Sequence, residues 1–205
     1  LAPLTFLLIP FAAPTIGLIL GRGKFDAAAV DLTAHALVMF AIGLLAVAAL
    51  NVLQRAFYAL SDSVTPFVVG VVTMLIHILL NLILMQSLAL AGIALSASLS
   101  SIAGALALTL LLARRVPRID FIGLGKLVLQ SAIVALASTL VVTGLFASLN
   151  LAGESMSARI IGVAFAAGGG AIYFIAALVL RIPESRMLVD LGFGFLRRFK
   201  REAST

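Results

Sequence analysis

The sequence has no cysteine and no tryptophan, and only 8 of its 205 residues are Asp or Glu. Without cysteine it cannot form a disulfide framework, a thiolate metal site or a cysteine nucleophile. Charged residues make up 11%, against about a quarter in ordinary soluble domains. Hydrophobic residues make up 63%, more than a soluble chain of this length can bury. The composition therefore predicts an integral membrane protein and argues against soluble enzymes, disordered tails and nucleic-acid modules.

Six segments are free of acidic residues and long enough to cross a bilayer, which takes about 20 apolar residues per helix. They cover residues 1–20, 33–53, 66–88, 91–112, 124–148 and 160–180. Backbone polar groups must be paired inside lipid, and long apolar runs without two-residue alternation favour helices over a barrel. The expected fold class is an all-α polytopic bundle of six transmembrane helices. Because the chain begins at Leu1 inside an apolar run, we expect it to be a fragment.

Basic residues are distributed unevenly between the two sides of the expected bundle. One side carries 11 of the 14 Lys and Arg residues. Basic residues gather in cytoplasmic loops, so we expect the C-terminus in the cytoplasm and interpret the net charge of +6 as a sign of orientation. Residues 182–205 combine hydrophobic residues at helical spacing with a basic cluster, which is typical of an amphipathic helix on the inner leaflet. A nucleic-acid-binding arm is the alternative for this tail.

Prolines and capping residues indicate where the helices begin, bend and end. Thr65 and Pro66 suit the N-cap and first turn of the third segment. Pro117 and Pro183 follow the fourth and sixth segments, where helix stops are expected. The first segment contains three prolines, Pro3, Pro10 and Pro14. Interior prolines free carbonyls and bend a helix, so this segment is either a kinked helix that lines a cavity or one bent for packing.

Small residues recur at every fourth position on two segments. They are Gly92, Ser96, Ser100 and Gly104 on the fourth segment, and Gly162, Ala166 and Gly170 on the sixth. A face of small side chains lets another helix approach closely, and van der Waals contact drives helix association in lipid. We expect close helix packing on these faces, with a sliding or substrate-lining surface as the alternative.

Polar side chains are rare within the expected spans. Besides Ser and Thr they are His35, Asn51, His77, Asn81 and Gln130. Buried polar groups are costly in lipid and are candidates for function, although a single interhelical hydrogen bond can give an amide a structural role. His77 and Asn81 lie four residues apart and therefore share a helix face. If that face meets Ser98 and Ser101, the four side chains form a cluster suited to a cation or a substrate hydroxyl.

The sequence carries no constellation for covalent chemistry. It has no Ser/His/Asp set, no paired carboxylates and no cofactor fingerprint, and its triple glycine at 168–170 lies inside an expected membrane helix, where a phosphate loop does not form. We expect a binding or transport protein rather than an enzyme.

Three passages, read together, resemble a known family. They are Gly21-Arg22-Gly23-Lys24-Phe25, the stretch from Arg55 to Pro66 with Phe57, Tyr58 and Asp62, and Gly92-Ile93-Ala94-Leu95-Ser96. Their order and spacing resemble the MurJ/MviN family of lipid II flippases, within the multidrug/oligosaccharidyl-lipid/polysaccharide (MOP) exporter superfamily. The stretch from Arg55 to Pro66 is the most specific part, and the resemblance is strong from Leu1 to about Arg115.

The resemblance implies a fold and a function. Members have fourteen transmembrane helices, in two six-helix lobes around a central cavity and an additional pair. Residues 1–115 would be the last four helices of the second lobe, 116–181 the additional pair with a lipid-tail groove, and 182–205 a basic cytoplasmic tail. The protein would move lipid II, the lipid-linked peptidoglycan precursor, across the bacterial inner membrane by alternating access. The alternatives are another MOP-superfamily exporter, for a lipid-linked oligosaccharide or a drug cation, and a structural membrane module.

The resemblance also implies partners and supporting residues. The substrate's diphosphate would meet arginines in the remaining N-terminal part of the same protein, and the other partners would be membrane lipids. Asn81 and Ser101 match cavity-side positions associated with a coupling cation in some members, and Met85 stands where a carboxylate would strengthen that site. His77 and Asn51 are further lining candidates. No cofactor or metal is expected, only coupling to an ion gradient or to the membrane potential.

Overall fold

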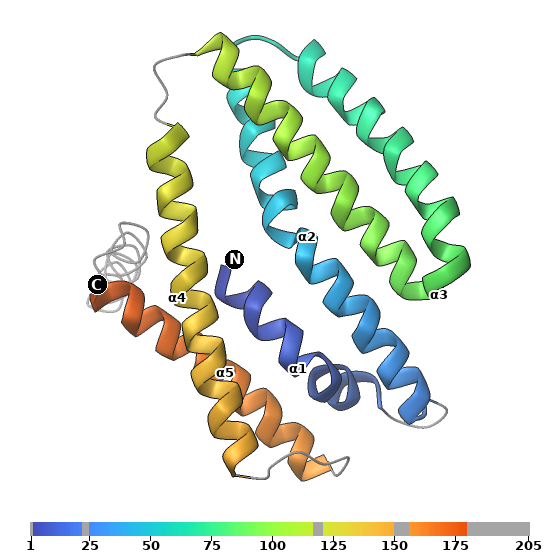
Figure 1. Ribbon diagram of the computed structural model, residues 1–205, viewed down its shortest axis with the longest axis vertical. Helices are drawn as coiled ribbons and strands as arrows, with labels where there is room; N and C mark the ends of the chain where they lie inside the picture. The colour runs from blue at the N-terminus through green and yellow to red at the C-terminus, as the bar shows by residue number, and fades with distance from the viewer. Residues whose placement is uncertain (1, 22–24, 117–120, 150–155, 180–205) are drawn as a thin grey trace, which may run out of the picture.

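The structure is a computed structural model that describes residues 2–21, 25–116, 121–149 and 156–179. The regular structure in these ranges is entirely helical (Figure 1). The helices are α1 (Ala2–Leu20), α2 (Ala27–Ala59), α3 (Val64–Arg115), α4 (Phe121–Ser148) and α5 (Met156–Val179). Each is long and apolar enough to cross a membrane, which confirms the all-α membrane class. The expected helix stops Pro117 and Pro183 and the tail 182–205 lie outside the described residues.

The expected number of six helices differs from the five in the described ranges because α3 contains two of the expected spans. Figure 1 shows α3 folding back on itself. The reversal lies at Ala89, whose φ of 47° and ψ of −125° leave the helical region. We call residues 64–88 the first arm of α3 and residues 90–115 its second arm. The expected spans 66–88 and 91–112 flank Ala89, so the division between them was placed correctly even though Leu88, Ala89 and Leu90 continue the apolar run through the turn.

Helix α2 packs along α3, and one cluster of this contact lies near the C-terminal ends of both helices. Phe57 and Leu108 are fully buried there, and Leu112 is nearly so. Hydrocarbon tails are as apolar as these side chains, so in lipid the cluster is stabilised by close packing and little by exclusion of water. This contact fixes the end of α2 against the second arm of α3.

Helix α1 lies between the α2–α3 unit and the pair formed by α4 and α5 (Figure 1). Leu7 and Phe11 of α1 form a buried cluster with Val142 of α4. The ring of Phe146 lies edge-to-face with both Phe11 and Phe165, with ring centroids 5.5 Å apart in each pair. Such aromatic pairs contribute about 0.5–1.5 kcal/mol each beyond the area they bury, so this cluster joins α1, α4 and α5.

Two prolines lie inside α1, Pro10 and Pro14, and Figure 1 shows the helix changing direction along its length. Proline removes an amide donor and its ring presses against the preceding turn, which explains a bend at this place. A Cβ added at Gly162 of α5 would lie 2.9 Å from Cβ of Pro14, so the bent region of α1 is also where α5 approaches. The bend therefore serves helix packing at least at its second proline.

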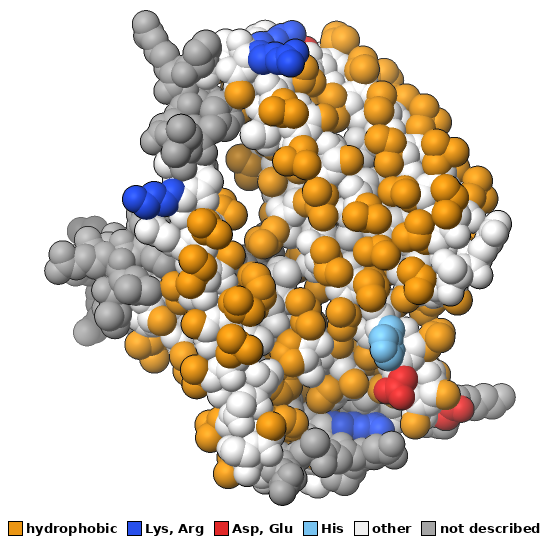
Figure 2. Space-filling model, viewed as in Figure 1, with side chains coloured by type: hydrophobic (Ala, Val, Ile, Leu, Met, Phe, Trp, Pro, Cys, Tyr) orange, Lys and Arg blue, Asp and Glu red, His pale blue; other side chains and the backbone are white. Residues whose placement is uncertain are grey.

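The surface over the spans is hydrophobic. Figure 2 shows mainly hydrophobic side chains on the visible face, with few charged groups, which lie toward its edges. Phe67, Met74 and Leu110 are examples of large exposed side chains, with 71%, 64% and 64% of their surface exposed. An apolar surface of this extent is stable in lipid and not in water.

Candidate functional site

The chain between α2 and α3 is a short structured turn. Helix α2 ends in a Schellman arrangement: the Ser61 amide donates to Tyr58 O and the Asp62 amide donates to Phe57 O, both at 3.0 Å. Ser61 has a φ of 57°, the left-handed conformation that this type of helix end requires. Within the stretch quoted for the family resemblance, Phe57 and Pro66 are buried, while Arg55 and Tyr58 are exposed.

Asp62 joins the two ends of α3. Its carboxylate accepts hydrogen bonds from the amides of Val64 and Thr65, at 3.1 and 3.0 Å, and from the Thr65 hydroxyl at 2.6 Å. It also forms an ion pair with Arg115, at the end of the second arm. The expected capping role of Thr65 is therefore wrong: Asp62 caps the first turn of α3, and Thr65 donates to it.

Asp62 lies outside the spans, and its surroundings favour the ionised form. The Thr65 hydroxyl and then the Thr65 amide, together with the charge of Arg115 and the Val64 amide, lower the pKa of the Asp62 carboxyl, against an opposing effect of desolvation. Only 12% of the Asp62 side chain is exposed, whereas Arg115 is 52% exposed. This arrangement is a structural clasp, since the carboxylate is already occupied by three hydrogen bonds and the ion pair with Arg115.

A polar cluster lies between the two arms of α3. Nδ1 of His77 is 3.5 Å from the hydroxyl oxygens of both Ser96 and Ser100. Both serines are buried, with 0% and 4% of their surface exposed. Asn81, one helical turn beyond His77, has a buried Oδ1 without a hydrogen-bond partner. The expected polar cluster on the His77–Asn81 face therefore exists, but its serines differ from the expected ones.

The two serines expected beside His77 have other hydrogen bonds. Ser98 faces α2, where its hydroxyl donates to Met39 O at 2.6 Å and accepts from the Gly43 amide at 3.1 Å. The Ser101 hydroxyl donates to Ala97 O within its own helix at 2.8 Å. The physical reason is the rotation of 100° per residue, which places Ser96 and Ser100 on one side of the arm and Ser98 on nearly the opposite side.

Asn51, a predicted lining residue, lies away from the cluster around His77. Its side chain is exposed and donates to Val47 O of its own helix at 2.9 Å. His35 is likewise exposed, and its Nδ1 lies 2.8 Å from Asp31 O. An amide or imidazole bonded to its own helix is satisfied without a neighbour, so neither residue joins the cluster around His77.

The small residues mark several close approaches. A Cβ at Gly104 would lie 2.8 Å from the Thr73 hydroxyl oxygen, and one at Gly92 would collide with the carbonyl of Leu84 across the turn of α3. On α5 the structure differs from the expectation for Gly170: a Cβ there would meet nothing within 4 Å. The neighbouring Gly169 makes the close contact instead, since its Cβ would lie 2.6 Å from Leu7.

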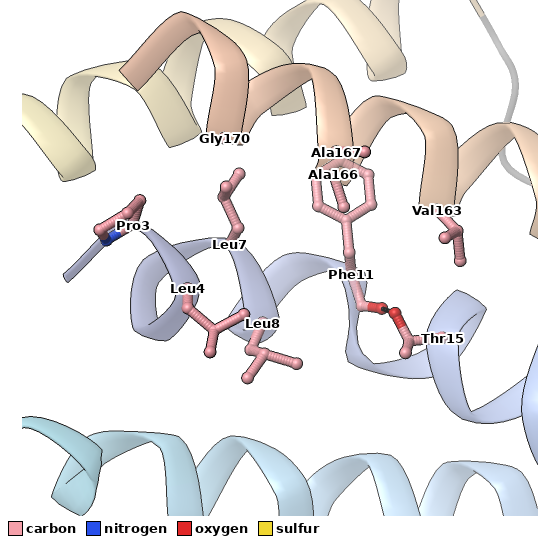
Figure 3. A pocket seen from close by; sticks show the side chains of 10 residues that line it. All are labelled: Pro3, Leu4, Leu7, Leu8, Phe11, Thr15, Val163, Ala166, Ala167 and Gly170. Atoms are coloured by element: carbon pink, nitrogen blue, oxygen red, sulfur yellow. Dashed lines mark hydrogen bonds between the residues drawn. The ribbon is translucent and has the colours of Figure 1, made fainter. Parts of the chain in front are cut away.

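A pocket of about 390 Å³ lies between α1 and α5 (Figure 3). Its lining is almost entirely apolar; it comprises Pro3, Leu4, Leu7, Leu8, Phe11 and Thr15 of α1 and Val163, Ala166, Ala167 and Gly170 of α5. In Figure 3 the side chains of Leu7 and Phe11 point from α1 toward α5. The Thr15 hydroxyl donates to Phe11 O at 2.7 Å, so the polar group in the lining is already paired. The pocket suits an aliphatic ligand.

Arg159 connects α5 with the C-terminal turn of α1, beyond this pocket. Its guanidinium donates to Gly17 O at 3.0 Å, and this carbonyl also accepts the Gly21 amide at 3.1 Å. The carbonyls at a helix C-terminus carry partial negative charge, which favours a cation there. Sequence reasoning, which used the basic residues only to assign the two sides of the bundle, missed this contact. It also passed over Gly43, although a lone glycine in a long membrane helix is a sign of close packing.

Neither metal binding nor anion binding is supported by the described residues. They contain no group of three or more His, Cys, Asp or Glu side chains placed to hold a metal ion. Basic side chains of the described helices lie near helix ends; they are Arg55, Arg114, Arg115, Lys126 and Arg159. The middle of these spans therefore offers apolar surface, one polar cluster and no cation.

Comparison with known proteins identifies the family. A family model described as Lipid II flippase MurJ matches residues 1–185 of the chain. The chain belongs to the lipid II flippase MurJ family. This confirms the resemblance drawn from the sequence.

Two curated relatives and one solved structure show how much of a MurJ protein the chain covers. The "Probable lipid II flippase MurJ" of Thermotoga maritima is 40% identical over 95 residues, which are 46% of this chain and 20% of that protein. The "Lipid II flippase MurJ" of Burkholderia cenocepacia is 32% identical over 114 residues, 56% of this chain and 22% of that protein. A structure described as "Lipid II flippase MurJ, inward closed conformation" matches with a TM-score of 0.66 and 20% identity, over 87% of this chain and 36% of that one.

The small share of each relative that is matched limits which properties of MurJ proteins can be transferred to this chain. The matched regions amount to about a fifth of the length of the two MurJ relatives. At 20% identity, the likeness to the solved MurJ structure shows the fold alone. The helices described above are therefore an arrangement found in MurJ proteins, of which this chain presents a part.

Proposed function

We propose that the chain acts in a lipid II flippase, as the part that follows the remaining N-terminal helices of the same protein. The two parts would move lipid II across the bacterial inner membrane by alternating access, rocking about a site near the bilayer midplane. Family membership and the lipid-exposed helices support this proposal. The role is transport, without a covalent step, and it is coupled to an ion gradient or to the membrane potential.

The orientation follows from the charges. Arg55, Arg114 and Arg115 lie at the ends of α2 and α3, and the excess of basic residues predicts that this side faces the cytoplasm. A cytoplasmic C-terminus agrees with this assignment. Labelling of single cysteines introduced at Ser61 and at Asp26, in intact cells and in inverted vesicles, tests it.

The described spans lack basic side chains away from their ends, which suggests that the two parts of the protein contact different parts of the substrate. A diphosphate taken into a low-dielectric cavity requires cationic partners. The described spans of this chain have their basic groups near the helix ends. We therefore assign the diphosphate to the remaining N-terminal part, and assign to this chain the contact with the apolar part of the substrate.

The pocket between α1 and α5 carries this assignment. Its lining is apolar, its volume is about 390 Å³, and the helices around it present hydrophobic surface to lipid. An isoprenoid chain in such a pocket gains dispersion contacts along both helices, while the polar headgroup remains free to enter a central cavity. The sequence-based prediction placed the lipid-tail groove on the last two helices. That groove stays a prediction, and the pocket described here lies between α5 and α1.

A pair of matched substitutions tests the pocket. Ala167 lines the pocket, whereas Ala164 of the same helix is exposed outside it. Ala167→Phe should fill part of the pocket and reduce translocation of fluorescent lipid II in membrane vesicles about tenfold, equivalent to ~1.4 kcal/mol. Ala164→Phe should leave the rate unchanged. Both variants are made in the gene product that carries this chain and compared at equal membrane levels. Equal rates for the two would contradict the role of the pocket, and equal transport of another lipid-linked glycan would contradict the substrate.

A further inference from the structure

The hydroxyl of Ser98 bridges a donor and an acceptor of the α2 backbone. It accepts from the Gly43 amide at 3.1 Å and donates to Met39 O at 2.6 Å, with Phe40 O as a second acceptor at 3.2 Å. In a regular helix the amide of Gly43 and the carbonyl of Met39 bond to each other. A side chain inserted between such a pair is one of the recognised causes of a bend in a helix.

The same groups have a second way of pairing that does not use the bridge. Serine hydroxyls elsewhere in the second arm of α3 donate to carbonyls of their own helix; they belong to Ser96, Ser100 and Ser101. If the Ser98 hydroxyl turned in the same way to Ala94 O, the Gly43 amide would bond directly to Met39 O. Each arrangement contains two hydrogen bonds and leaves no donor unpaired. The cost of a buried unpaired group therefore excludes neither arrangement.

The two halves of α2 have different neighbours, and Gly43 is the middle residue of this helix, Ala27–Ala59. The C-terminal half packs on α3, where Phe57 and Leu108 belong to one buried cluster. Figure 1 shows α1 beside the N-terminal half of α2, which extends beyond the reversal of α3. Glycine restrains the backbone least of all residues. A bend at Gly43 would therefore tilt the N-terminal half of α2, together with α1, against the α3 hairpin.

We propose that Ser98 is a movable bridge that makes residues 39–43 of α2 a hinge. When the Ser98 hydroxyl turns to its own helix, the backbone ladder of α2 closes and the N-terminal half of α2 changes its tilt. Because the cluster of Leu7, Phe11 and Val142 joins α1 to α4, these helices move with it. This inference rests on the proposed function only for its role, which is to let one group of helices rock against another during alternating access.

The hinge is tested by pulsed electron spin resonance on the gene product that carries this chain, in lipid nanodiscs. Nitroxide labels are attached to cysteines at Leu32 and Val52, exposed positions on the two halves of α2, after any cysteine outside this chain has been replaced. We expect two distances between the labels. Ser98→Ala has no bridging hydroxyl and should lower the population of one distance about fivefold. The control is Thr109→Val, because the Thr109 hydroxyl bonds to Ala105 O of its own helix.

Gly43→Ala is a second variant that acts on the bridge from the side of α2. A Cβ at Gly43 would lie 2.5 Å from Ser98 Cα, so it should push the two helices apart and disfavour the bridge. It should shift the label distances in the same direction as Ser98→Ala does. Gly70→Ala, where a Cβ meets nothing within 4 Å, should not shift them. A single distance in the native protein that neither Ser98→Ala nor Gly43→Ala changes would overturn the hinge.

The role in transport is tested with fluorescent lipid II in membrane vesicles, with the variants compared at equal membrane levels. Ser98→Ala should slow translocation about fivefold, and Thr109→Val should not. If Ser98→Ala changed the label distances and left the rate of translocation unchanged, the role of the hinge in transport would be overturned. If the unmodified protein moves no lipid II at all, the proposed function fails, and the label distances still decide whether α2 bends at Gly43.

Discussion

The hydroxyl of Ser98 lies within the backbone hydrogen-bond ladder of α2, beside Gly43. The Gly43 amide donates to Ser98 Oγ at 3.1 Å, and the Ser98 hydroxyl donates to Met39 O at 2.6 Å. In a regular helix the amide of residue 43 would bond directly to the carbonyl of residue 39. One side chain from the second arm of α3 thus completes the backbone bonding of α2, and it joins the two helices near the middle of α2.

The approach of α2 and α3 at this point requires a residue without a side chain. A Cβ at Gly43 would lie 2.5 Å from Ser98 Cα, and backbone atoms cannot move aside as a flexible side chain can. We expect Gly43→Ala to destabilise the protein by about 1–3 kcal/mol. Gly70→Ala is the control, because a Cβ there meets nothing within 4 Å, and it should be neutral or stabilising by up to about 1 kcal/mol. Thermal unfolding in detergent measures both. Equal melting temperatures would contradict the close contact.

The reversal of α3 places Ala89 at a φ of 47°, a conformation that glycine adopts more readily than alanine. Ala89→Gly should therefore stabilise the hairpin by about 1 kcal/mol. The matched control is Ala91→Gly, inside the second arm, which should cost about 0.5–1 kcal/mol because glycine is unfavourable in a helix. The two changes in melting temperature should have opposite signs. Destabilisation by both would mean that residue 89 is helical and that α3 does not turn there.

Asp62 makes stability depend on pH in the acid range. Its pKa in the folded protein lies below its ordinary value of about 3.9, so the unfolded chain binds more protons in this range. The stability contributed by Asp62 is therefore complete above about pH 4 and is lost as the pH falls through the lowered pKa. Asp62→Asn should lower the melting temperature at neutral pH and flatten its decline on acidification. Asp31→Asn, on an exposed residue of α2, serves as the control. If the melting temperatures of the native protein and of Asp62→Asn fell equally on acidification, the stabilising role of the Asp62 carboxylate would be refuted.

The hydrogen bond from Arg159 to Gly17 holds α5 against α1 beyond the apolar pocket. Arg159→Gln should weaken this attachment by about 1.5–3 kcal/mol, as expected for a hydrogen bond from a charged donor. Lys126→Gln removes an equal charge from an exposed position of α4 and should have little effect. A cysteine pair introduced at Leu8 and Val163, both of which line the pocket, reports the attachment through its cross-linking rate. An unchanged cross-linking rate in Arg159→Gln would show that the aromatic cluster alone holds α5 against α1.

Much of the fold could be predicted from particular residues. The apolar runs located the spans, because each is long enough to cross the bilayer and backbone groups in lipid must pair within their own helix. Pro10 and Pro14 indicated the bend of α1, and the spacing of His77 and Asn81 put both on one face. Five helices are described where six spans were expected, because the spans 66–88 and 91–112 are the two arms of α3, which reverses at Ala89.

The site was predicted less completely, and the serines of the second arm show why. Periodicity separated Ser96 and Ser100 from Ser98, but it does not say which neighbour each face meets. Ser98 was expected beside His77 and instead completes the backbone of α2. Asn51 bonds to its own helix, which any amide in a membrane helix can do, and its lining role stays a prediction.

The sequence by itself determined the solvent of this protein, its helical class and its family, because composition, span length and local motifs are properties of the chain read in order. Only the tertiary structure decided that two serines face His77 while a third enters α2, that α1 shares its pocket with α5, and that Arg159 reaches Gly17. The physical reason is that contacts between helices in lipid depend on how each helix is rotated about its axis and how closely it approaches its neighbour. Close approach at residues such as Gly43 and Gly169 fixes both.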